Sequence, residues 1–114
     1  MRLKEINNKA GYVIVYTTVE RKKDAIRIAK ILVKERLSAC VNVVYGLNSI
    51  YRWKGKTVNS KESLLIIKTH RNLLSAIEKR LIEIHPYELP EIISVDIKYG
   101  LHNYLKWIND NIIK

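Results

Sequence analysis

Residues 38–69 read SACVNVVYGLNSIYRWKGKTVNSKESLLIIKT, with apolar side chains at alternate positions through much of the stretch. In the first half, three such positions mark one face of an extended chain: Ala39, Val41 and Val43. This period of two is typical of a β-strand. Gly46 interrupts the pattern, and an isolated glycine inside a strand indicates a bulge. We therefore expect a long strand from Ser38 to Trp53 with an irregularity at Gly46.

The strand is followed by a turn signal and a second apolar run. Lys54-Gly55 predicts a two-residue hairpin turn, and Asn59-Ser60 is the alternative. The return strand ends in residues 64–69, LLIIKT. The whole stretch therefore predicts a β-hairpin that is long for a small domain.

A strand and a helix are expected before the hairpin. Residues 12–18, YVIVYTT, form a continuous β-branched and aromatic run, which indicates a central strand buried on both faces. Thr17 and Glu20 have the spacing of a capping box at the start of a helix. In this predicted helix, apolar residues recur at steps of three and four and form the inner face: Ala25, Ile28, Ala29, Leu32, Val33 and Leu37. Four cations occupy the outer face: Lys23, Arg27, Lys30 and Lys34.

The segment after the hairpin predicts a helix, a strand and a final helix. The first helix buries four apolar residues: Leu74, Ile77, Leu81 and Ile84. Pro86 ends it, because proline lacks an amide donor and disfavours helix in the residue before it. Residues 92–97 predict a fourth strand, and a short C-terminal helix follows Gly100.

The expected order is β-α-β-β-α-β followed by one helix. This is the α+β ferredoxin-like sandwich, with an antiparallel sheet and a long hairpin between its second and third strands. We expect a single domain over residues 1–114, in which residues 1–10 form a polar N-terminal extension. Tyr51 and Trp53 lie near the hairpin turn, beyond any core of the domain. Long edges and exposed aromatic rings of this kind favour pairing with another chain.

The composition limits the possible function classes. The net charge is +10, and residues 1–57 hold 13 Lys/Arg against 4 Asp/Glu, whereas residues 58–114 hold 8 against 7. The sequence has no apolar stretch that would span a bilayer and no signal-peptide pattern at Met1. Cys40 is the single cysteine, so no disulfide forms within the chain. We expect a cytoplasmic protein without a membrane partner.

The sequence contains none of the common catalytic signatures. There is no phosphate-binding glycine loop, nucleophile elbow, HEXXH or CXXC motif. Cys40 lies in an apolar strand with no adjacent base, which favours a buried structural thiol. The densest polar cluster is residues 85–91, HPYELPE. His85, Glu88 and Glu91 are possible ligands of a transition metal, and the alternative is a structural turn in which these groups satisfy backbone donors.

Several segments together resemble the CutA family of divalent-cation-tolerance proteins. They follow in order along nearly the whole chain after residue 11: residues 15–18 (VYTT), 35–42 (ERLSACVN), 49–56 (SIYRWKGK), 67–69 (IKT), 85–91 (HPYELPE) and 104–107 (YLKW). The combination of ACVN, WKGK and HPYEXPE is specific. Tyr16 and Arg80 stand where some bacterial members carry additional cysteines.

The resemblance implies a homotrimer similar to PII-type signalling proteins, with sheet pairing between subunits through the long hairpin. It implies tolerance of, or response to, divalent cations, and no enzymatic activity. Cys40 and His85 belong to the region that the family associates with copper. Interface or cleft residues are expected at five positions: Tyr51, Trp53, Lys68, Tyr87 and Trp107.

Two expectations about ligands follow. Copper, or another divalent cation, is expected to bind modestly through His85, Glu88 and Glu91 rather than through Cys40, because imidazole and carboxylate groups suit Cu(II) better than one apolar thiol. The alternative function is a PII-like module that binds a small anion or nucleic acid through the basic surface. No stacking platform or groove-reading helix is evident, so no specific nucleic-acid partner is expected.

Overall fold

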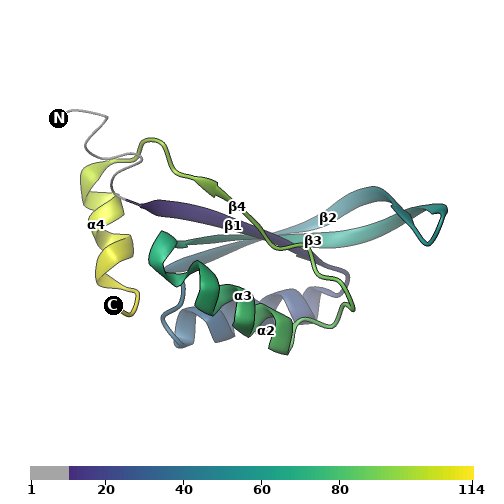
Figure 1. Ribbon diagram of the computed structural model, residues 1–114, viewed down its shortest axis with the longest axis horizontal. Helices are drawn as coiled ribbons and strands as arrows, with labels where there is room; N and C mark the ends of the chain where they lie inside the picture. Colours follow the sequence, from purple (N-terminus) through teal and green to yellow (C-terminus); the bar gives the residue numbers. More distant parts are fainter. Residues whose placement is uncertain (1–10) are drawn as a thin grey trace.

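The computed structural model describes residues 11–114, which fold into a four-stranded sheet covered by helices (Figure 1). The strands are β1 (Tyr12–Val19), β2 (Cys40–Trp53), β3 (Lys56–His70) and β4 (Ile93–Asp96). The helices are α2 (Lys22–Lys34), the short 3₁₀ helix η2 (Arg71–Leu73), α3 (Leu74–Ile84) and α4 (His102–Asp110). The strand order is β2-β3-β1-β4, and every neighbouring pair is antiparallel. The predicted ferredoxin-like order with a C-terminal helix is therefore confirmed.

The core lies between one face of the sheet and the helices α2 and α3, which run across that face (Figure 1). Burial alternates along β1, so that Val13, Val15, Thr17 and Val19 face the helices and the residues between them are half-buried. The central position of β1, between β3 and β4, is as predicted. The predicted burial of β1 on both faces is not observed, because no helix within residues 11–114 covers the second face as α2 and α3 cover the first.

Two local predictions about α2 are wrong. The helix begins after Arg21, whose side chain makes no capping bond, and Thr17 is buried inside β1 instead of starting a capping box. Strand pairing with β3 continues to Val19, so the chain reaches the helix four residues later than the Thr17 signal suggests. Val33 is 40% exposed, although the other predicted inner residues are buried: Ala25, Ile28, Ala29, Leu32 and Leu37.

The hairpin of β2 and β3 extends beyond the rest of the sheet (Figure 1). β1 pairs with β3 only from Ser63 to His70, while β3 begins at Lys56. Residues 56–62 therefore pair with β2 alone. The register between β2 and β3 shifts between Val44 and Leu47, which confirms the bulge predicted at Gly46. The subunit is correspondingly elongated, with principal extents of 49 × 26 × 23 Å.

The hairpin turn is formed by Lys54 and Gly55, as the sequence predicts, and Asn59-Ser60 lies inside β3. Both turn residues have positive φ, 51° for Lys54 and 78° for Gly55. This is the turn geometry that matches the twist of paired strands and that favours Asn-Gly. No helix in residues 11–114 has the length and apolar character needed to cross a membrane.

The turn geometry predicts that substitutions at Lys54 and Gly55 change the free energy of unfolding in opposite directions. Gly55→Ala should destabilise the protein by about 1 kcal/mol, because alanine resists positive φ. Lys54→Asn should stabilise it by a few tenths of a kcal/mol, because asparagine tolerates this conformation better than lysine. Urea unfolding of both variants, with Lys56→Ala as the control outside the turn, measures the difference. Equal effects at the two positions would contradict the turn geometry.

Candidate functional site

The segment 85–92 connects α3 to β4 and crosses the end of β1, where a hydrogen bond between His85 and Thr18 anchors it. α3 ends at Ile84, and His85 adopts an extended backbone (φ −80°, ψ 135°) before Pro86. The His85 Nε2 atom lies 2.9 Å from the carbonyl oxygen of Thr18, and the Tyr87 N–H donates to His85 Nδ1 at 3.1 Å. These partners require a neutral ring with its proton on Nε2.

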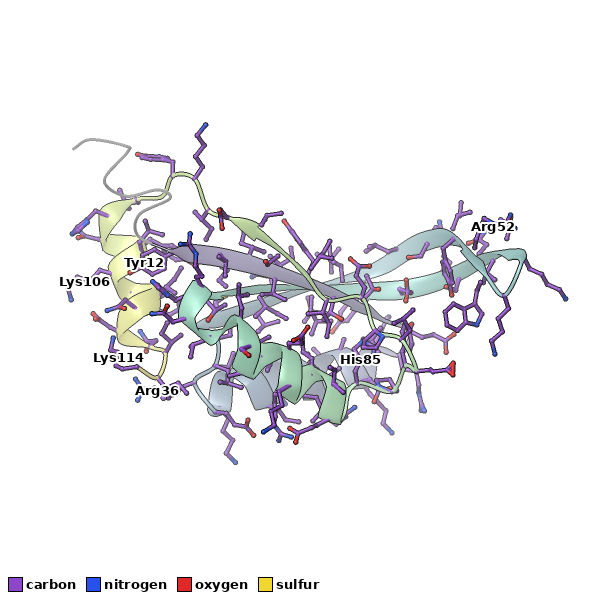
Figure 2. All side chains as sticks on the ribbon, in the orientation of Figure 1. Tyr12, Arg36, Arg52, His85, Lys106 and Lys114 are labelled. Carbon is purple, nitrogen blue, oxygen red and sulfur yellow. The ribbon has the colours of Figure 1, made fainter. Side chains whose placement is uncertain are left out.

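Burial keeps His85 neutral. The ring is 7% exposed and lies where α3 ends beneath the sheet (Figure 2). Loss of solvation lowers the pKa of His85, and the bond to the Thr18 carbonyl opposes this effect only partly. Both nitrogens are therefore occupied by backbone groups in the state that this environment favours. This is the structural turn that the sequence left open as an alternative.

A second contact joins the same segment to the hairpin. The Tyr87 hydroxyl donates to Glu62 Oε2 at 2.6 Å, a length typical of a bond to an ionised carboxylate. Glu62 is only 6% exposed, and it lies one residue beyond Ser63, the last residue of β3 that pairs with β1. Burial, and then the bond to Glu62, raise the pKa of Tyr87. The contact fixes segment 85–92 to the base of the overhanging hairpin.

These contacts border an open cavity of about 650 Å³. The hairpin, the end of β1 and segment 85–92 contribute its lining: Thr18, Tyr51, Trp53, Glu62, Tyr87, Glu88, Leu89, Pro90, Glu91, Ile92 and Ile93. Three of these residues are carboxylates and three are aromatic, and none is Lys, Arg or His. The cavity is thus an acidic and aromatic site on a chain whose net charge is +10.

The residues predicted from the sequence separate into two groups. Glu88 and Glu91 lie at the cavity with Tyr51, Trp53 and Tyr87, and His85 anchors the same segment from beneath. The other three lie toward the opposite end of the sheet, where Cys40 pairs with Lys68: Cys40, Lys68 and Trp107. The Lys68 Nζ atom lies 3.4 Å from the Tyr104 hydroxyl, and the Tyr104 ring stacks on Trp107.

The predicted metal ligands do not form one cage within the subunit. Cys40 lies opposite Lys68, which pairs with Ile14, whereas His85 binds Thr18, four residues further along β1. At about 3.3 Å per residue, this separation is roughly 13 Å. Cys40 Sγ lies 3.8 Å from Asn42 Oδ1. In the part of the chain that the structure describes, no three His, Cys, Asp or Glu side chains converge as a metal site would require.

Sequence reasoning missed Glu62. It lies in the predicted return strand, where a carboxylate is expected to face solvent. One signal was available, since Glu62 is the only acidic residue between Glu35 and Glu78 and directly precedes an apolar run. Its burial depends on Tyr87, which is 25 residues away in the sequence.

The fold and the site together define a class of protein: a ferredoxin-like α+β subunit with an overhanging hairpin and an acidic, aromatic cavity at the hairpin base. Comparison with known proteins specifies the family. The family model described as CutA1 divalent ion tolerance protein matches residues 13–111. The chain belongs to this family.

Individual relatives agree with this assignment. The divalent-cation tolerance protein CutA of Thermus thermophilus is 45% identical over 98 residues, covering 86% of this chain and 95% of that protein. The chloroplastic CutA protein of Arabidopsis thaliana is 36% identical over 111 residues, which are 97% of this chain and 61% of the plant protein. The solved structure of the Thermus thermophilus divalent cation tolerance protein has a TM-score of 0.87 at 43% identity, covering 90% of this chain and 99% of that one.

The Tyr87–Glu62 bond gives a prediction for stability. Tyr87→Phe removes the hydroxyl and leaves a buried carboxylate without its donor, which should lower the free energy of unfolding by about 1–3 kcal/mol. Tyr45→Phe serves as a control, since the Tyr45 hydroxyl has no hydrogen bond among the described residues. Denaturant unfolding near pH 7 measures both variants. An unchanged Tyr87→Phe midpoint would show that the bond contributes little.

The environment of His85 gives a pH dependence. Because its pKa is lowered in the folded state, the unfolded chain binds more protons at this residue than the folded chain does. The stabilising contribution is present above the unfolded pKa of about 6.5 and should be lost as pH falls through the lower folded value. Unfolding at a series of pH values between about 7 and 5 measures the loss. His85→Gln, which does not titrate, should show a flatter profile, and an equally steep one would contradict the assignment.

Proposed function

We propose that this protein is a homotrimeric divalent-cation tolerance or response protein that acts by binding and without catalysis. The observation that carries the proposal is the overhanging hairpin, which a single subunit leaves without a core. The family membership supports the cation response. A non-catalytic role is supported by the hydrogen bonds of His85, which occupy both ring nitrogens, and by the position of Cys40 far from that histidine. The cytoplasmic location stays a prediction.

The assembly is supported by apolar surface in two places. On the hairpin, Ile50 is 69% exposed, and the rings of Tyr51 and Trp53 are also exposed. On the sheet, every residue of β4 is exposed, and β4 is an edge strand. Unpaired edges next to exposed apolar side chains favour pairing with further copies of the chain. Pairing through the hairpin would bury the strand edges and the exposed side chain of Ile50, which lies on the hairpin face opposite Tyr51 and Trp53.

The cation response is supported by the charge of the cavity. Glu88 and Glu91 are exposed at its mouth and three residues apart, where they attract cations to an otherwise basic chain. We propose that copper, which heads the divalent affinity order, binds modestly at these two carboxylates. His85 joins as a ligand only where its bond to the Tyr87 amide opens, and Cys40 takes no part.

The alternative, a module that binds anions or nucleic acid, rests on the outer face of α2. Lys23, Lys30 and Lys34 are exposed there and make no ion pair among the described residues. Arg27 differs, because it pairs with Asp24 and donates to the Ile84 carbonyl. A face of this kind attracts phosphate without reading sequence. We therefore rank it as a non-specific electrostatic surface.

The trimer is tested by its mass. The subunit mass is 13.3 kDa, so size exclusion with light scattering should give about 40 kDa at micromolar concentration. A double variant, Ile50→Lys with Trp53→Lys, places two charges on the exposed part of the hairpin and should shift the mass toward the monomer. Lys98→Glu, outside the hairpin, is the control. A wild-type mass of 13.3 kDa would exclude the proposed assembly.

Copper binding is tested by calorimetric titration of wild type and variants. Glu88→Gln with Glu91→Gln should weaken Cu(II) binding about tenfold or more, because two of the proposed ligands lose their charge. Cys40→Ser should leave the affinity unchanged, and His85→Ala reports whether the ring takes part. His70 and His102 are replaced separately as control sites. Loss of binding in Cys40→Ser alone would place copper at the opposite end of the sheet.

A further inference from the structure

Glu62 is a buried carboxylate without a cationic partner. It is 6% exposed, and its Oε2 accepts the Tyr87 hydroxyl. Within residues 11–114, Glu62 forms no ion pair, and Oε1 accepts no hydrogen bond. Buried charges in proteins are normally paired with an opposite charge, because removing a carboxylate from water is costly. The neutral phenol of Tyr87 satisfies one oxygen only, so Oε1 is left as an acceptor without a donor among the described residues.

The walls around Glu62 are aromatic. Residues 56, 58, 60 and 62 of β3 share one face of the hairpin, and Tyr51 and Trp53 are the cross-strand partners of Val58 and Lys56 on that face. Tyr51 and Trp53 therefore lie on the same side as Glu62, and Tyr87 completes the lining from the opposite segment. The face of an aromatic ring attracts organic cations. The Trp53 ring already has an ammonium nearby, since Lys54 Nζ lies 5.8 Å from its centroid.

The remaining residues of the lining favour an organic cation over a metal ion as the ligand of this cavity. Leu89, Pro90 and Ile92 provide apolar walls, which suit a carbon skeleton and offer nothing to a hydrated ion. A compact metal ion needs several ligands around one point, and no three candidate side chains meet in this way in the described part of the chain. An ammonium group needs only one or two acceptors, and Glu62 Oε1 supplies one.

We propose that this cavity binds a small organic ammonium ion with an apolar body. Its ammonium group donates to Glu62 Oε1, and its body lies among Tyr51, Trp53 and Tyr87. The volume of about 650 Å³ falls within the usual range for small-molecule sites. The inference goes beyond the proposed function, since it concerns a different class of ligand at Glu62, deeper than the carboxylates assigned to copper. The binding experiments use the full chain in its native oligomeric state.

The test uses 2-phenylethylammonium as the probe and Trp53 as the reporter. The chain has two tryptophans, so Trp107→Phe, a change on α4, leaves Trp53 as the single fluorophore. At near-physiological salt and pH 7, the amine should change the Trp53 emission in a saturable way. The neutral analogue 2-phenylethanol and the anion 3-phenylpropanoate should each bind about tenfold more weakly or worse, because only the amine meets the carboxylate.

Variants connect the binding to Glu62. Glu62→Gln keeps the size of the side chain and an acceptor for Tyr87, and should weaken amine binding about tenfold or more. Glu78→Gln removes an equal charge on the exposed face of α3 and should leave the affinity unchanged. Should Glu62→Gln fail to fold by circular dichroism, Trp53→Leu replaces it, with calorimetry as the readout, its mass by light scattering matched to that of wild type, and the same loss expected.

Three results would overturn the proposal. Equal affinity for the amine and the alcohol would show a merely apolar groove, and unchanged amine binding in Glu62→Gln would place the cation elsewhere. Absence of amine binding to the folded, assembled protein would also overturn it, and would indicate that a basic side chain of another copy fills the site. Copper titration of the wild-type protein keeps the two ideas apart: intact copper binding by wild type with no amine binding rejects this inference and leaves the proposed function standing.

Discussion

The unequal lengths of neighbouring strands govern the architecture of this subunit. β3 has 15 residues and β1 has 8, so the antiparallel pairing between them ends at Val19 and Ser63 while β3 continues with β2 alone. Beyond that point, no third strand and no helix of residues 11–114 supports the hairpin. The bulge in β2 and the contacts of segment 85–92 both lie at the position where the pairing between β1 and β3 stops. The bulge around Gly46 lies opposite Ser63, and there the ladder shifts its register.

Segment 85–92 makes hydrogen bonds to both strands at the position where the pairing between β1 and β3 ends. His85 binds the carbonyl of Thr18 at the end of β1, and Tyr87 binds Glu62 at the first unsupported position of β3. A carboxylate can be buried there because a donor reaches it across the gap. The hydrogen bonds that stabilise the boundary thereby also shape the cavity, in which acidic and aromatic groups meet on an otherwise basic chain. The site is thus a consequence of how the sheet ends and of the connecting segment 85–92 that crosses this end.

The position of the candidate ligands follows from this geometry. The histidine of the HPYELPE segment is used for anchoring, and the two glutamates that follow it remain at the surface. Cys40 belongs to the opposite end of the sheet, with Lys68 and the aromatic pair of Tyr104 and Trp107. In the proposed cation response, the groups open to a metal ion are therefore the carboxylates Glu88 and Glu91. The exposed hairpin and edge strand are the features on which the proposed assembly rests.

The sequence by itself determined the elements of this fold, including the hairpin turn at Lys54-Gly55, the bulge at Gly46 and the end of α3 before Pro86. These features depend on local periodicity and on the backbone preferences of glycine and proline, which act within a few residues. The motif HPYELPE and the aromatic pair Tyr51 and Trp53 likewise pointed to the region of the site. Local signals failed where strand pairing overrode them, as at Thr17, which belongs to β1 and caps no helix.

Only the tertiary structure decided the chemistry of the site. Whether His85 is a ligand or an anchor depends on a carbonyl 67 residues away, and the importance of Glu62 depends on a hydroxyl 25 residues away. Neither contact can be recognised from the hydrophobic periodicity of the sequence, because its two residues lie far apart along the chain. Burial and the supply of a partner are properties of the packed chain, and they determine whether a given carboxylate is a solvated surface charge or a binding group.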